Sequence, residues 1–112
     1  MNECVPIELV LDENFQKQVI ESPLPVAVVF EKSCWGTAQI IKPILEKVAI
    51  EYANRIKVFK YSLDNNSAAY AEYRIENTTT VLLFKEGKVI YRTGLVSKEE
   101  FKSIINSILL KS

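Results

Sequence analysis

Histidine is absent from this chain of 112 residues, and cysteine occurs only at Cys4 and Cys34. Without histidine, neither a Ser-His-Asp triad nor a Cys-His pair can form, and zinc cannot be bound through imidazole. Two cysteines supply neither a four-thiolate metal site nor a disulfide framework. We therefore expect no metal and no cofactor.

Net charge and long apolar runs are also lacking. Lys+Arg is 14 and Asp+Glu is 14, so the formal net charge is zero. This balance gives no electrostatic reason to expect nucleic acid or an anionic membrane as a partner. No apolar run reaches the roughly 18 residues of a membrane span, and the N-terminus shows no signal-peptide pattern. The composition predicts one cytoplasmic domain over residues 1–112, with no nucleic-acid or membrane partner.

The most informative stretch runs from Pro25 to Leu45. Val26 to Phe30 is a continuous apolar run rich in β-branched residues, which is typical of a strand buried on both faces. A polar turn over 31–36 follows, and apolar residues then return at helical spacing. The pattern predicts a central strand that leads into a long helix over about 36–52. Reactive groups often lie at such a junction, because the helix N-terminus offers free N–H groups and a positive dipole end.

The rest of the chain predicts short strands alternating with helices. We expect Asp12 to N-cap a short helix, Asp64-Asn-Asn-Ser67 to cap a second one, and Ser97-x-x-Glu100 to form a capping box for the last helix. Further strands are expected at 5–10, 56–63, 78–84 and 89–93, the last two joined as a hairpin. The order β-α-β-α-β-α-β-β-α predicts an α/β fold: a mixed five-stranded sheet with helices on both faces.

The stretch from Phe30 to Leu45 resembles the thioredoxin family. That family has a buried strand ending in Phe, then Trp-Cys-Gly-Pro-Cys-Lys, then a helix containing Pro-Ile-Leu. Phe30, Gly36 and Pro43-Ile44-Leu45 hold the matching places here without a gap. The resemblance covers nearly the whole chain and implies a thioredoxin-like fold.

The residues at the family's redox positions are different. In the family the first motif cysteine attacks a disulfide and the second resolves the mixed disulfide. These two positions correspond to Trp35 and Ala38. The buried acid that accepts a proton corresponds to Val29, and the cis proline before the fourth strand corresponds to Thr79. The resemblance therefore supports the fold and speaks against the family's dithiol chemistry.

Three functional hypotheses follow from these differences. The first is a redox-silent domain that binds a protein or peptide through the former active-site surface. The second is a monothiol thiol–disulfide oxidoreductase of thioredoxin type that uses Cys34, the only candidate thiol in the loop. The favoured interpretation of Cys34 itself is a partly buried thiol without a role, at the place where the family has Trp. The third is a structural subunit of a larger assembly, and the chain itself is expected to be a monomer or a weak homodimer. The expected peptide-binding surface comprises Trp35, Gly36, Thr37, Ala38, Thr78 and Thr79.

Expectations also follow for several other residues. Glu31 and Lys60 can pair, although a solvated Glu31 at the strand end is the favoured interpretation. Trp35 either anchors a partner or folds back over apolar surface near Thr79. The Thr78–Thr79 peptide bond is expected to be trans, because a cis bond before a non-proline residue costs about 3–4 kcal/mol. Cys4 is expected to have no role. Tyr70 and Tyr73 are expected at the core and its rim, and 85–88 as a solvated hairpin tip.

Overall fold

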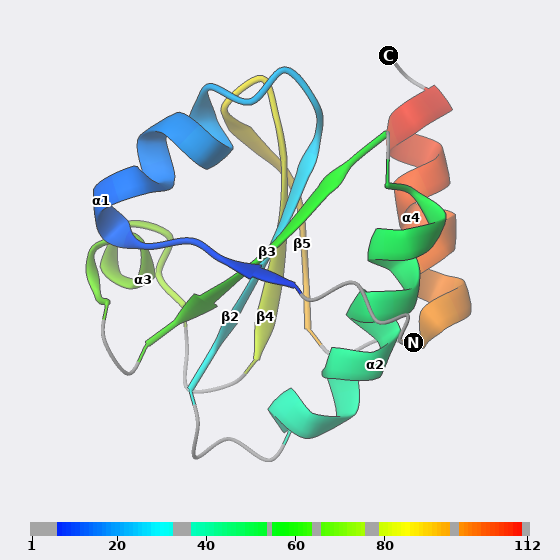
Figure 1. The fold of residues 1–112 in the computed structure, drawn as a ribbon, viewed down its shortest axis with the longest axis horizontal. Coiled ribbons are helices and arrows are strands. Elements are labelled where there is room, and N and C mark those ends of the chain that lie inside the picture. Colours follow the sequence, from blue (N-terminus) through cyan, green and yellow to red (C-terminus); the bar gives the residue numbers. More distant parts are fainter. Residues whose placement is uncertain are drawn as a thin grey trace.

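A five-stranded mixed sheet organises the molecule in the computed structural model (Figure 1). The structure describes residues 7–32, 37–53, 55–63, 66–75, 79–94 and 97–110. The strand order is β1-β3-β2-β4-β5, with β2 parallel to β3 and antiparallel to β4. The strands are β1 (Glu8–Leu9), β2 (Val26–Glu31), β3 (Lys57–Ser62), β4 (Thr80–Lys85) and β5 (Lys88–Thr93). The predicted fold class is confirmed.

Helices cover both faces of the sheet, so that two apolar clusters form. The helices are α1 (Asp12–Phe15), the π-helical η1 (Gln16–Ile20), α2 (Thr37–Glu51), α3 (Ala68–Glu72) and α4 (Lys98–Leu110). On one face α1, η1 and α3 pack over Val26, Val28 and Phe30, and on the other α2 and α4 pack over Ala27 and Val29. Because successive strand residues point to opposite faces, β2 is apolar throughout, as its sequence predicted. None of the described helices has the length and apolar character needed to cross a bilayer.

Three local features agree with the sequence predictions: the N-terminal cap of α4, the turn between β4 and β5, and the placement of two tyrosines. Ser97 Oγ accepts a hydrogen bond from the Glu100 N–H at 3.1 Å, and the Ser97 N–H donates to Glu100 Oε1 at 3.2 Å, which is the predicted capping box. Glu86 and Gly87 both have positive φ, at 54° and 81°, as a two-residue hairpin turn requires. Tyr70 and Tyr73 are partly buried against the first cluster, as predicted.

The role predicted for Asp12 is wrong. Leu11 is the N-cap of α1, and its N–H donates to Asn14 Oδ1 at 2.8 Å. Ser67 does precede α3, but its side chain makes no capping hydrogen bond. Asp64 and Asn65 lie outside the described residues, so the rest of that expected cap stays a prediction. The N–H groups at the start of α3 are capped by a residue distant in sequence, a contact that local patterns cannot report.

That distant residue is Asp12 itself. Its carboxylate accepts hydrogen bonds from the N–H groups of Ser67 and Ala68, both at 3.1 Å, and of Ala69 at 3.4 Å. It also accepts the Tyr61 hydroxyl at 2.5 Å. Desolvation by itself raises the pKa of Asp12, but the hydrogen bonds from Tyr61 and the three N–H groups outweigh it and leave that pKa below its usual value. Burial, together with the bond to Asp12, raises the pKa of Tyr61 to about 12.

We predict that Asp12→Ala lowers the free energy of unfolding by about 2 kcal/mol at neutral pH, because it removes the α3 cap and a charged acceptor for Tyr61. The neighbouring exposed Glu13→Ala is the matched control and should change stability by less than about 0.5 kcal/mol. Urea unfolding measures both.

The pH dependence gives a second check on Asp12. Since the folded state lowers the pKa of Asp12, its stabilisation is present above the unfolded-state value of about 3.9 and is lost as pH falls through the folded-state value. The difference between wild type and Asp12→Ala should therefore shrink below about pH 4. An equal difference at low and neutral pH would contradict the charged cap.

Candidate functional site at the carboxyl end of the central strand

One end of the sheet brings together the elements expected to carry function. The carboxyl end of β2, the start of β4 and the first turn of α2 all lie toward the lower edge of Figure 1. β2 ends at Glu31 and α2 begins at Thr37, so Cys34 occupies the covalent connection between them. This is the strand-to-helix junction at which α/β folds commonly place reactive groups.

Several predicted site residues lie outside the described part of the chain. They are Cys4, Cys34, Trp35, Gly36 and Thr78. The trans Thr78–Thr79 peptide bond therefore stays a prediction, as do the orientation of Trp35 and the roles of the two cysteines. Thr37 and Ala38 belong to the first turn of α2. Thr79 is buried and directly precedes β4.

Val29 is completely buried in the middle of β2. In register it lies opposite Lys60 on β3 and Val81 on β4, and it belongs to the apolar cluster beneath α2. The position that corresponds to the family's buried acid is therefore buried here as well, with a valine in place of the carboxylate.

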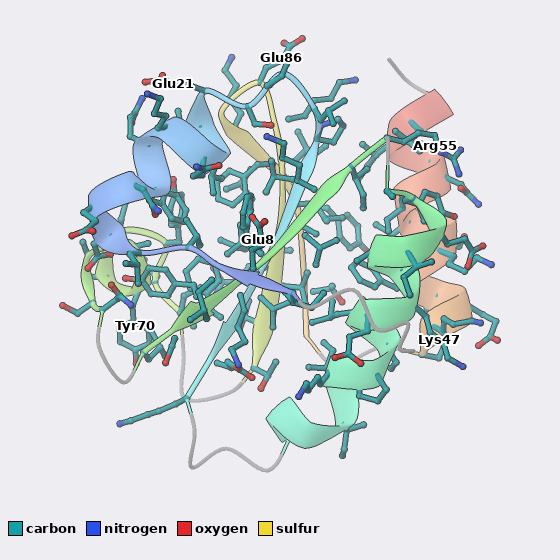
Figure 2. The ribbon with its side chains drawn as sticks, viewed as in Figure 1. Glu8, Glu21, Lys47, Arg55, Tyr70 and Glu86 are labelled. Atoms are coloured by element: carbon teal, nitrogen blue, oxygen red, sulfur yellow. The ribbon has the colours of Figure 1, made fainter. Side chains whose placement is uncertain are left out.

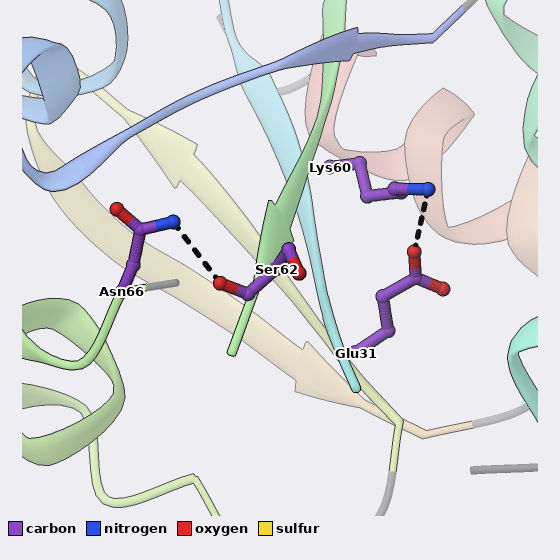
Figure 3. Close-up of polar contacts among 4 residues, drawn as sticks. All are labelled: Glu31, Lys60, Ser62 and Asn66. Carbon is purple, nitrogen blue, oxygen red and sulfur yellow. Dashed lines mark hydrogen bonds and ion pairs between the residues drawn. The ribbon is translucent and has the colours of Figure 1, made fainter. Parts of the chain in front are cut away.

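The nearest carboxylate along the same face of β2 is Glu31, two residues further on. Its Oε2 accepts the ammonium of Lys60 at 2.8 Å (Figure 3). The Glu31 side chain keeps only 12% of its surface exposed and that of Lys60 keeps 39%. The favoured expectation of a solvated Glu31 is thus wrong, and the alternative pairing is confirmed. The reason is geometric: side chains at i and i+2 share one face of a strand, so Glu31 points toward α2 as Val29 does.

A cavity of about 210 Å³ opens beside this ion pair. The two strands contribute Glu31 and Lys60, and α2 contributes an apolar wall and a charged rim. Ile7 also lines the cavity, and the α2 residues are Ile41, Lys42, Leu45 and Glu46. Lys42 and Glu46 lie one helical turn apart, so they share one face of α2. The sequence analysis did not identify this pair, although its spacing is visible in the sequence. The cavity therefore combines a small apolar pocket with charges of both signs at the end of β2.

The fold and this junction define a thioredoxin-type α/β protein, and comparison with known proteins agrees. The family model described as Thioredoxin matches residues 6–107. The chain is 38% identical over 101 residues to "Thioredoxin" from Acidithiobacillus ferridurans, covering 89% of this chain and 94% of the relative. It is 33% identical to "Thioredoxin" from Porphyra purpurea, covering 92% and 97%, and 37% identical to that from Rickettsia conorii, covering 87% and 93%. The chain belongs to the thioredoxin family.

These relatives contradict the leading functional prediction. A redox-silent binding domain was inferred from the loss of the motif cysteines, the buried acid and the cis proline. Relatives that carry the name thioredoxin match nearly the full length of the chain, and nothing among them points to a redox-silent binding role. Residue losses at four positions were given too much weight against similarity spread over about 100 positions.

Proposed function

We propose that this protein carries out thiol–disulfide exchange on protein or peptide disulfides, with Cys34 as the attacking thiol. Membership in the thioredoxin family is the observation that carries this proposal. Its support within the chain is the position of Cys34 between β2 and the N-terminus of a fifteen-residue helix. A helix N-terminus favours the thiolate, which is the nucleophilic form of cysteine.

The exchange proceeds by successive substitutions at sulfur. The Cys34 thiolate bonds to one sulfur of the substrate, the substrate S–S bond breaks, and the other sulfur leaves as a thiolate. A low-molecular-weight thiol then attacks the Cys34 sulfur and releases the second substrate thiolate. Another molecule of the same thiol attacks this new mixed disulfide, which returns Cys34 and yields the small-molecule disulfide. Two electrons pass from the two small thiols to the substrate. Because the reaction consumes reduced thiols, we place it in the cytoplasm, where thiols are kept reduced.

The substrate chain would lie against the surface around Cys34. In this proposal Trp35, Gly36, Thr37, Ala38, Thr78 and Thr79 contact the backbone on either side of the substrate disulfide. Thr79 is only 1% exposed, so its contribution comes through the main chain that leads into β4. An extended substrate backbone pairing with such a segment is a common mode of peptide recognition.

Labelling with dipyridyl disulfide tests which cysteine reacts. The reagent releases pyridine thione when a thiolate attacks it, so absorbance follows the rate and peptide mapping identifies the modified residue. We expect Cys34 to react at least about tenfold faster than Cys4, because thiols at a helix N-terminus are richer in thiolate. Cys4→Ser is the matched control and should keep the fast phase. A fast phase that persists in Cys34→Ser would contradict the proposal.

A further inference from the structure

A second, larger cavity lies far from the Cys34 junction, as a groove between β5 and α4. Its volume is about 520 Å³, within the range typical of small-ligand sites. Ile90 and Tyr91 from the strand and Ile104 and Ile108 from the helix form its apolar lining. Ile90 and Tyr91 remain 43% and 44% exposed, although both are large and apolar. The groove shares no residue with the cavity beside Glu31 and Lys60.

A β-bulge explains why two consecutive strand residues line this groove. Leu83 pairs with Tyr91 and the next residue of β4, Phe84, pairs with Val89, so Ile90 is the extra residue of β5. In a regular strand, Ile90 and Tyr91 would point to opposite faces, but a bulge re-aims a side chain. The bulge also twists the exposed edge of β5, which opposes the addition of a strand from a peptide or a second copy. The geometry therefore favours a small molecule as the occupant.

The positive charge at one end of the groove favours a ligand with an anionic group. Among the described residues that line the groove, only Lys85 is charged, and it lies in register opposite Lys88 across the hairpin. Like charges directly opposite each other are unfavourable, and no ion pair with either lysine occurs among the residues that the structure describes. Ser103 and Ser107 add two hydroxyl groups along the helix side. An anionic group at this end would relieve the repulsion between the lysines.

We propose that this groove binds an amphiphilic monocarboxylate. Its apolar chain would lie between the bulge of β5 and the Ile104–Ile108 face of α4, and its carboxylate would meet Lys85. The β4–β5 turn and the last turn of α4 lie at the same end of the molecule (Figure 1). Lys85 therefore lies at the end of the groove where its apolar lining stops. The proposal does not depend on thiol chemistry.

Titration of the full chain with octanoate, followed by amide chemical shifts in two-dimensional NMR spectra, tests this site. We expect saturable shifts confined to β5, the end of β4 and α4, with a Kd of about 1 mM, as is usual for a ligand of this size. Octylammonium has the same chain and the opposite charge, and it should bind at least about tenfold more weakly because of Lys85 and Lys88.

Three variants, one of them a control, assign the contacts. Lys85→Gln should weaken octanoate binding about three- to tenfold, the range expected for a partly exposed ion pair. Lys47→Gln removes a lysine from the α2 side of the molecule, well away from the turn at Glu86 (Figure 2), and should leave the affinity unchanged. Ser107→Phe, at an exposed helix position, should fill the groove and abolish the shifts while the protein stays folded.

Four results of the binding experiments would overturn the proposal. They are an absence of saturable shifts, shifts centred outside the groove, equal binding of octanoate and octylammonium, and octanoate affinity that Ser107→Phe leaves intact. If instead the protein mass by light scattering doubles with concentration and Ser107→Phe prevents this, the groove is a contact between two copies and the ligand assignment is wrong.

Discussion

Val29→Asp is expected to lower the free energy of unfolding by at least about 3 kcal/mol at neutral pH. Val29 is fully buried beneath α2, so a carboxylate there must be desolvated or remain protonated. Lys60 lies opposite in register, but its ammonium already pairs with Glu31 at 2.8 Å. Compensation by that lysine is therefore incomplete. Thermal and urea unfolding measure the effect.

The pH dependence of stability separates the cost of burying a charge at position 29 from the cost of burying a neutral polar group. An acid whose folded-state pKa is raised costs little extra below the unfolded-state value of about 3.9, and its cost grows as pH rises toward the folded-state value. Val29→Asp should therefore lose stability relative to wild type between about pH 4 and pH 7. Val29→Asn, of matched size and polarity but without a titrating group, should show a constant difference. An unchanged melting temperature for Val29→Asp at pH 7 would show that the site is wetter than its burial indicates.

The sheet could be predicted because the sequence of its central strand shows that both of its faces are buried. Val26 to Phe30 is apolar on both faces, and the structure buries all five residues. The alternation of strand and helix patterns predicted parallel strands joined by crossover connections, as β1, β3 and β2 are. It did not predict the strand order, nor that β4, which also follows a helix, pairs antiparallel with β2. The edge was less predictable. The first strand was expected over 5–10, whereas the described strand is only Glu8–Leu9 and the chain turns into α1 at Asp12.

Contacts between distant segments account for what the sequence did not reveal. Asp12 was assigned to its own helix because capping patterns are local, yet its carboxylate caps α3, more than 50 positions away. The Glu31–Lys60 pair was considered, but whether it forms depends on the register between β2 and β3, which places Lys60 opposite Val29. The bulge at Ile90 is a shift in strand register, and no residue type in β5 predicts it.

The functional error had a different origin. The leading hypothesis inferred a redox-silent domain from Trp35 and Ala38, because the family's two cysteines occupy those positions, and kept monothiol chemistry at Cys34 as the alternative. That inference treats one arrangement of thiols as the only one that a related protein can use. Cys34 remains next to the junction, and full-length similarity to thioredoxins outweighs the substitutions. The part of the site that decides the matter lies at 33–36, outside the described residues.

The most direct test of thiol–disulfide exchange is the rate at which the protein accelerates insulin reduction by a fixed concentration of glutathione. The proposal predicts that Cys34→Ser lowers the accelerated rate at least about 100-fold, because serine cannot form the mixed disulfide at neutral pH. Cys4→Ser should stay within about twofold of wild type, and equal melting temperatures would show that both variants are folded. If Cys34→Ser reduces insulin as fast as wild type, or if wild type gives no acceleration over glutathione alone, the proposed function is wrong.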